Sequence, residues 1–313
     1  MSASASSPPR YAVIGNPVAH SRSPRIHALF GAQTGRPLIY ERLPATAETF
    51  RRTVEAFFDA GGGGLNVTVP FKQDAWNLAR ARLSPRAQLA GAVNTLWRRD
   101  GALHGCNTDG VGLVADLRRL QAPLQGARIL LVGAGGAARG VLQPLLDTGC
   151  ASLRIVNRTA ARAQELAAAW PAAHALSAGG LDDAGRDGGW DLVINATASS
   201  LGDAAPALPA GLYAPAALAY DMMYAAEPTP FMRQAMADGA GRAQDGLGML
   251  VEQAAESFFI WHGVRPDTGP VLAALRAELA ACAAGAVTGT ATGTAAKAAA
   301  GATTGTANGA GKG

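Results

Sequence analysis

The sequence predicts an α/β protein with two domains. Short runs of aliphatic and β-branched residues alternate with amphipathic helical segments, which is typical of parallel sheets covered by helices on both faces. A new series of strands and helices begins at Ala127, directly before a glycine-rich turn from strand to helix. The length of 313 residues suits about two domains of ordinary size.

The first domain is expected to begin with a buried strand and a helix whose first turn holds Pro24, a position that proline favours. Its elements in order are a strand at Tyr11–Gly15, a helix from near Ser23, a strand at Pro37–Leu43, a helix at Thr46–Ala60 and a strand at Leu65–Val69. The turn signal Arg99-Asp100-Gly101 then joins short strands at Thr95–Trp97 and Ala102–His104. This hairpin makes the first sheet a mixed one.

The second domain is expected to open with the apolar strand ARILLVG at residues 127–133 and a helix that runs to about Asp147. Further strands are expected at SLRIVN (152–157), DLVINAT (191–197) and ALAYDM (217–222). Two helices, Gly248–His262 and Asp267–Ala280, close the folded body. We therefore expect one domain at about residues 10–115 together with 246–281, and the other at 116–245.

Both ends differ in composition from this body. Residues 1–9 are rich in Ser, Pro and Ala and are expected to be disordered, and residues 282–313 form a low-complexity tail of Ala, Gly and Thr that we expect to be flexible. No apolar run approaches the roughly 18–20 residues of a membrane span, and no signal peptide precedes the first strand. We therefore expect a soluble cytoplasmic protein that does not act at a membrane.

Charge and cysteine usage exclude several classes of protein. The 27 basic residues exceed the 23 acidic ones by only four, and the arginine pairs are short and scattered. Aromatic residues make up only 6%, so no basic stripe for nucleic acid is expected. The three cysteines form no C-x-x-C pair and have no metal-ligand spacing. Neither a disulfide framework nor a metal site is expected.

The glycine-rich turn fits a dinucleotide-binding fingerprint. The segment Gly133-Ala134-Gly135-Gly136-Ala137-Ala138 matches G-x-G-x-x-G/A, follows a buried strand and opens a helix, which is the context that this motif requires. The glycines would let the amides at the helix N-terminus approach a pyrophosphate. A glycine-rich turn without a ligand is the alternative.

The end of the next strand favours NADP over NAD. An NAD enzyme commonly places Asp or Glu there to bind the ribose 2′-hydroxyl, whereas this chain has Asn157-Arg158-Thr159, with Arg162 one turn further on. A guanidinium can bind a 2′-phosphate with two hydrogen bonds, whereas a carboxylate would repel it. Alternatively, Arg158 is a solvated surface residue and Arg162 a charge on an exposed helix face.

Several segments carry more polar residues than loops between elements need. They are SRSP (21–24), NVTVPFK (66–72), GAVNT (91–95), GCNTDG (105–110), YDMMY (220–224) and DGLGMLVEQ (245–253). Together they closely resemble the shikimate dehydrogenase family, in order, over about residues 11–270. The combination of NVTVPFK, GAVNT and NTDG upstream of a dinucleotide fingerprint is highly specific.

The resemblance implies reversible reduction of 3-dehydroshikimate to shikimate with NADPH, a step on the route to chorismate and the aromatic amino acids. It implies a substrate domain with a mixed sheet, a Rossmann-type NADP domain, and a homodimer as one form of assembly. The implied catalytic pair is Lys72 and Asp109. The implied substrate ligands are Ser21, Ser23 and Tyr224 for the carboxylate, and Thr68, Lys72, Asn94, Asp109 and Gln253 for the ring. The implied cofactor residues are Gly133, Ala134, Gly135, Gly136, Ala137, Asn157, Arg158, Thr159, Arg162, Met222 and Gly246.

The chemistry of the reaction supports the catalytic pair independently. Hydride arriving at a ketone builds negative charge on its oxygen, which a positioned proton donor must neutralise. An ammonium group can do so, and Asp109 can hold it in place. The alternatives are structural: Lys72 as a surface residue, Asp109 and Ser23 as helix caps, and Tyr224 as a packing residue.

Related activities remain open at this stage. A quinate/shikimate dehydrogenase would accept quinate and often NAD, a regulator on the same scaffold would bind NADP without catalysis, and a folate dehydrogenase shares the two-domain plan. The paired serines and Arg158 argue against the first, the intact Lys72 and Asp109 against the second, and the Ser-x-Ser-Pro segment against the third. The segment 195–201 departs from the family pattern, so the contacts of Thr197 and Ser199 stay unassigned.

Overall fold

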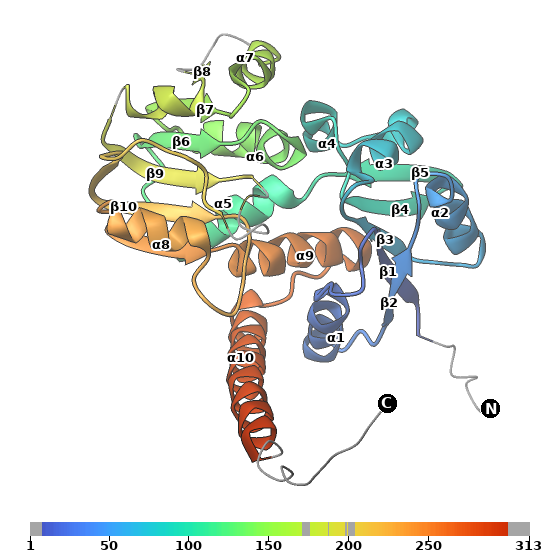
Figure 1. The fold of residues 1–313 in the computed structure, drawn as a ribbon. Coiled ribbons are helices and arrows are strands. Elements are labelled where there is room, and N and C mark those ends of the chain that lie inside the picture. Colours follow the sequence, from blue (N-terminus) through green and yellow to red (C-terminus); the bar gives the residue numbers. More distant parts are fainter. Residues whose placement is uncertain (1–7, 171–175, 187, 198, 200–203, 300–313) are drawn as a thin grey trace, which may run out of the picture.

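The computed structural model describes residues 8–170, 176–186, 188–197, 199 and 204–299, and it describes the side chains of the last helix as far as Ala283. The chain forms two α/β domains, each built around its own sheet (Figure 1). This arrangement confirms the predicted fold class. The expected disorder of residues 1–9 falls largely outside the described residues, as does the end of the tail from residue 300.

The first sheet is mixed, as the hairpin predicted. Its strands in spatial order are β2 (Ile39–Pro44), β1 (Arg10–Gly15), β3 (Gly64–Val67), β4 (Thr95–Arg99) and β5 (Ala102–Cys106). The first three run parallel, whereas β4 is antiparallel to both β3 and β5. At the turn, Asp100 and Gly101 have φ of 51° and 74°, the left-handed pair that a two-residue hairpin needs.

Helices cover both faces of this sheet. The helices of the first domain are α1 (Ser23–Thr34), α2 (Phe50–Asp59), α3 (Lys72–Leu78) and α4 (Pro85–Ala90), with a 3₁₀ turn at Arg80–Arg82. One face packs Ile14 and Leu65 against Phe50 and Phe57 of α2 and Phe71 before α3. The opposite face meets α1 and α9 (Leu247–His262), where Tyr11 of β1 stacks on Trp261. The last helix, α10 (Thr268–Ala299), packs against α9 and α1.

The second sheet is parallel throughout. Its strands in spatial order are β11 (Arg242–Asp245), β10 (Tyr213–Asp221), β9 (Trp190–Asn195), β6 (Arg128–Val132), β7 (Ser152–Val156) and β8 (Leu176–Gly179). Alternate residues of β6 face opposite cores: Ile129 and Leu131 pack toward one layer of helices, and Leu130 and Val132 toward the other. The first layer holds α5 (Asp109–Arg119), α6 (Gly136–Leu146) and α7 (Ala160–Ala168), and the second holds α8 (Pro230–Ala237) and the 3₁₀ turn Leu181–Gly185.

Two helices join the halves of the molecule. The chain leaves the first sheet through α5 and returns from β11 through α9, and these two helices pack side by side (Figure 1). Their packing is close at Gly248, where a Cβ atom would lie 2.0 Å from Oδ1 of the buried Asp116. The carboxyl ends of the parallel strands in both sheets therefore open toward a shared region, which is where ligands bind in open α/β sheets.

The structure differs from the sequence-based prediction at the end of the chain. The last helix was expected to stop at Ala280 and to be followed by a flexible tail, but α10 continues to Ala299. Alanine is the strongest helix former, and its density outweighs the scattered Gly and Thr in this segment. No helix within the described residues is long and apolar enough to cross a membrane.

Candidate active site

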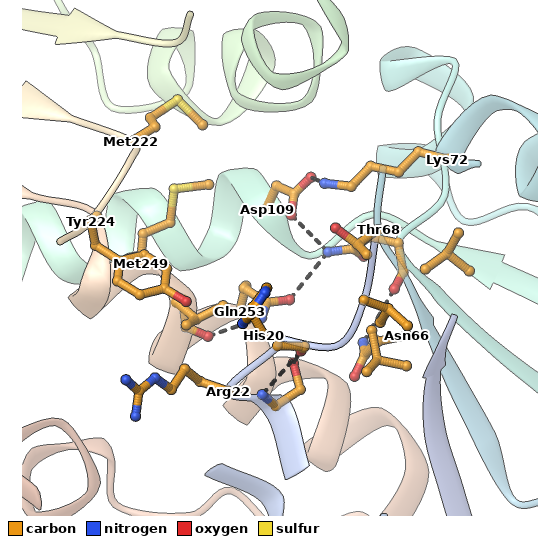
Figure 2. Close-up of a pocket in the computed structure, with 18 of the residues that line it drawn as sticks. His20, Arg22, Asn66, Thr68, Lys72, Asp109, Met222, Tyr224, Met249 and Gln253 are labelled. Atoms are coloured by element: carbon orange, nitrogen blue, oxygen red, sulfur yellow. Dashed lines mark hydrogen bonds and ion pairs between the residues drawn. The ribbon is translucent and has the colours of Figure 1, made fainter. Parts of the chain in front are cut away.

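A cavity of about 350 Å³ lies between the two domains, beside the ends of β1 and β3 (Figure 2). Every residue implied for the substrate contributes to its lining, and so do Met222 and Gly246 from the cofactor set. The substrate residues in the lining are Ser21, Ser23, Thr68, Lys72, Asn94, Asp109, Tyr224 and Gln253. Segments that lie more than 200 residues apart in the sequence thus contribute to one cavity.

The predicted catalytic pair is in direct contact. Lys72 begins α3 and Asp109 begins α5, and Lys72 Nζ donates to Asp109 Oδ2 at 2.6 Å. The lysine side chain is 26% exposed and the aspartate 9%, so the pair faces the cavity while its carboxylate is largely shielded. The N-cap of α5 is Thr108, so Asp109 does not cap the helix. Its charge nevertheless lies at the positive end of the helix dipole, which stabilises a carboxylate.

Asn94 fixes the other oxygen of this carboxylate. Asn94 Nδ2 donates to Asp109 Oδ1 at 2.8 Å, and it also approaches Gln253 Oε1 at 3.3 Å. The orientation of the amide is determined because the backbone N–H of Thr108, which can only donate, bonds Asn94 Oδ1 at 2.9 Å. Asn94 therefore presents its NH₂ group to Asp109 and to Gln253.

A buried group of hydroxyls behind the cavity holds Asn94, and the sequence analysis did not identify it. The Thr95 hydroxyl donates to Asn94 Oδ1 at 2.9 Å and lies 2.8 Å from the hydroxyl of Ser257, which is fully buried on α9. Asn66 Nδ2 donates to Ser257 Oγ at 3.0 Å, and Tyr40 donates to Asn66 Oδ1 at 2.7 Å. The sequence offers one indication of this group: Ser257 lies one helical turn after Gln253, so both side chains are on the same face of the helix.

Ser21 and Ser23 face each other at the start of α1. The Ser21 hydroxyl lies 3.2 Å from Ser23 Oγ and accepts from the Ser23 backbone N–H at 3.3 Å. The N-cap of α1 is Arg22, which makes no side-chain cap, so Ser23 is not the capping residue that one reading of the sequence allowed. Both hydroxyls belong to the lining of the cavity.

The position of Tyr224 is compatible with both roles that the sequence left open. It packs against the apolar cluster of α1, α9 and α10, and it also lines the cavity. Burial raises the pKa of its phenol, which the positive charge of Arg22 partly offsets. The hydroxyl is therefore a hydrogen-bond donor at neutral pH.

The glycine-rich turn has the conformation that the fingerprint predicts. Gly133 has φ of 111°, and a Cβ atom there would lie 3.0 Å from Thr197 Cγ2 and 3.2 Å from the Ala196 backbone. Gly135 and Gly136, at the start of α6, have nothing within 4 Å of the same point, so a ligand can approach their backbone. The geometry suits a pyrophosphate at the helix N-terminus.

The remaining cofactor candidates lie around the same strand ends. Asn157, Arg158 and Thr159 follow β7, and both Arg158 and Arg162 are exposed; within the described part of the chain neither forms an ion pair with a carboxylate. Gly246 lies against the Met222 backbone, with Met222 O 2.3 Å from the point where a Cβ would be.

The segment whose contacts the sequence left unassigned is tied to the end of β9. Thr197 Oγ1 donates to Asn195 Oδ1 at 2.7 Å and lies 2.7 Å from Ser199 Oγ. Asn195 Nδ2 donates in turn to the buried Asp221 at the end of β10. Among the described residues, no group of three or more His, Cys, Asp or Glu gathers as a metal site would require.

Comparisons with known proteins agree with this geometry. Residues 13–96 match the family model of the shikimate dehydrogenase substrate binding domain, residues 116–201 that of shikimate / quinate 5-dehydrogenase, and residues 246–276 that of the shikimate 5'-dehydrogenase C-terminal domain. The shikimate dehydrogenase (NADP(+)) of Bordetella petrii is 70% identical over 278 residues, which cover 87% of this chain and 97% of the relative. That of Bordetella avium is 70% identical over 277 residues, covering 87% and 96%.

Solved structures show the same fold. The shikimate 5-dehydrogenase of Thermus thermophilus, solved in complex with NADP(H) and shikimate, is 36% identical with a TM-score of 0.76, covering 86% of this chain and 98% of that one. An Ael1 enzyme from Pseudomonas putida is 44% identical with a TM-score of 0.80, covering 85% and 98%. With these similarities and the cavity described above, the chain belongs to the shikimate dehydrogenase family.

Proposed function

We propose that this protein is an NADP-dependent shikimate dehydrogenase, which interconverts 3-dehydroshikimate and shikimate. The observation that carries the proposal is the contact of 2.6 Å between Lys72 Nζ and Asp109 Oδ2 inside a cavity lined by hydroxyl and amide side chains. A small polyhydroxy acid needs many fixed donors and acceptors, and the lining offers them. Family membership and the NADP named for the Bordetella relatives support the same assignment.

The proposed catalytic step uses Lys72 as the proton donor. In the direction of reduction, negative charge develops on the C3 oxygen, and the Lys72 ammonium gives it a proton. Asp109 orients that ammonium through Oδ2, while Asn94 holds Oδ1. Because neighbouring side chains fix these contacts, little reorganisation is needed when the charge develops.

The other residues bind and orient the ligands. Ser21, Ser23 and Tyr224 would hold the substrate carboxylate, and Thr68, Asn94 and Gln253 the ring hydroxyls. When bound, NADPH supplies the hydride and NADP⁺ accepts it. Its pyrophosphate would lie at the glycine turn 133–137 and its 2′-phosphate near Arg158 and Arg162, with Met222 and Gly246 beside the nicotinamide.

Initial rates with shikimate and quinate, each with NADP and NAD, test this assignment. We expect shikimate with NADP to give the highest kcat/KM. A higher kcat/KM for quinate would instead identify the quinate/shikimate dehydrogenase activity that the sequence left as the alternative. The cytoplasmic location and the homodimer expected from the sequence stay predictions.

Replacing Arg158 with alanine should raise the KM for NADP about 10- to 150-fold, since a charge-assisted contact to phosphate is lost. The KM for NAD, which lacks the 2′-phosphate, should change little. Arg186, an exposed arginine paired with Asp183, provides the matched control in an Arg186→Ala variant. Equal weakening of both cofactors by Arg158→Ala would show that Arg158 does not bind the 2′-phosphate.

Replacing Ser21 or Ser23 with alanine should weaken shikimate binding by about 0.5–3 kcal/mol for each hydroxyl, because each would lose a hydrogen bond to a charged group. The dissociation constant of an uncharged analogue without the carboxylate should change much less. If the two ligands lose affinity equally, the serines act on the loop structure rather than on the carboxylate.

A further inference from the structure

The carboxylate end of the cavity has neutral ligands for a charged group. Ser21, Ser23 and Tyr224 all offer hydroxyls, which carry no positive charge. At the other end, the charge of Lys72 is balanced by Asp109 at 2.6 Å. Moving an anion out of water without a nearby positive charge is costly, so a cation beside these hydroxyls would strengthen the binding of shikimate.

Arg22 is the cation in the right place. Arg22 lies between Ser21 and Ser23 in the sequence. Its side chain lines the cavity, and only 29% of that side chain is exposed. In Figure 2 it lies below Tyr224, at the opposite end of the drawn site from Lys72. Burial raises the pKa of the Tyr224 phenol and the positive charge of Arg22 lowers it, so Arg22 acts electrostatically on one of the three hydroxyl ligands.

Neighbouring charges leave this end of the cavity positive. Arg25 Nε donates to Glu278 Oε1 at 2.8 Å, whereas Arg22 Nη1 lies 3.9 Å from Glu278 Oε2. Arg42 donates to the Ser21 carbonyl through both Nε and Nη2, at 3.1 and 2.6 Å. Arg42 is thus bound to the serine loop, and Arg22 and Arg25 are opposed by one carboxylate of α10, Glu278. That carboxylate is bound tightly to Arg25 and only loosely to Arg22. Asp245, whose charge also acts on Tyr224, is paired with Arg276.

We propose that Arg22 determines the specificity of this site for anionic substrates, and that Glu278 on α10 sets how strongly it does so. This inference rests on the proposed function, because it takes shikimate as the ligand. Arg22 supplies the positive charge that the hydroxyl ligands lack, attracting the substrate and holding its carboxylate. The negative charge of Glu278 partly offsets the positive charge of Arg22. Removing the Glu278 carboxylate should therefore strengthen the attraction of Arg22 for the substrate.

The test compares charge variants at saturating NADP with shikimate as the varied ligand. At low ionic strength, Arg22→Gln should lower kcat/KM about 3- to 10-fold through KM, with kcat nearly unchanged. Arg22→Lys should keep most of the affinity, and Glu278→Gln should raise kcat/KM about 2- to 5-fold. Arg51→Gln is the control, because it removes one positive charge outside the cavity. Arg51 pairs with Glu55 on α2 and both side chains are exposed, so kcat/KM should be unchanged.

Salt and an uncharged ligand complete the test. For the wild-type protein, kcat/KM should fall as ionic strength rises from about 0.02 to about 0.5 M, and the fall should be shallower in Arg22→Gln. The affinity for the amide of shikimate, measured by calorimetry, should be the same in both proteins. Equal losses for acid and amide, an unchanged salt dependence, or a decrease in Glu278→Gln would each overturn the proposal. Wild-type protein that does not turn over shikimate would contradict the proposed function instead.

Discussion

Replacing Lys72 with alanine is expected to lower kcat by about 10²- to 10⁴-fold, the usual contribution of a positioned acid–base group. The KM for shikimate should change only a few-fold, because the ammonium acts on charge that develops in the transition state. Steady-state kinetics with shikimate varied at saturating NADP measure both quantities.

The neighbouring Gln73 provides a control on the same helix. Gln73 is exposed and lies outside the cavity, so Gln73→Ala should retain normal turnover. A Lys72→Ala variant with nearly normal kcat would remove the lysine from the mechanism. A large rise in KM with unchanged kcat would make Lys72 a binding residue only.

Replacing Asp109 with asparagine is expected to lower kcat/KM about 10- to 150-fold, as for the loss of a hydrogen bond between charged groups. Both oxygens of Asp109 accept hydrogen bonds, from Lys72 and from Asn94, so an amide would turn its NH₂ toward one of these donors. Part of the loss should appear in KM, because Asp109 would also contact a ring hydroxyl. The kinetic constants of Asp109→Asn separate the two components.

The double variant Lys72→Ala/Asp109→Asn tests whether the residues act as a pair. If Asp109 works mainly by orienting the ammonium, the double variant should be little slower than Lys72→Ala alone. Losses that add in free energy would show that the two side chains act independently. Thermal unfolding of each variant separates this coupling from a loss of folded protein.

The sequence predicted the inner strands of both sheets and the edge strands β2 and β5, but it did not predict the two edge strands of the second sheet. Continuous apolar strands such as β6 and the glycine turn after it carry strong local signals, because their burial requires those residue types. The edge strands β8 and β11 were missed: Arg242–Asp245 is largely polar and Leu176–Gly179 is short, and their strand conformation comes from pairing with β10 and β7. The extension of α10 was not predicted because residues 282–299 have no apolar face, whereas their alanine content favours a helix.

The predicted site residues came from motifs, and the structure brings the substrate set together around one cavity. The residues behind them could not be identified in this way. Ser257 and Tyr40 lie outside the motifs, and Thr95 ends one of them with no sign of its role. Only the folded chain shows that these residues hold Asn94 and Asn66 in place. The place of Arg22 in the cavity could not be predicted either, because an arginine between two serines in a loop is normally a surface residue.

The rate of NADPH formation in a single turnover tests whether Lys72, oriented by Asp109, transfers the proton in the NADP-dependent oxidation of shikimate. Enzyme in excess over NADP would be mixed with saturating shikimate, for the wild-type protein and for Lys72→Ala. We predict rapid NADPH formation by the wild-type protein and a rate constant for Lys72→Ala that is lower by at least the factor seen in kcat. Formation of NADPH by both proteins at the same rate would contradict the account.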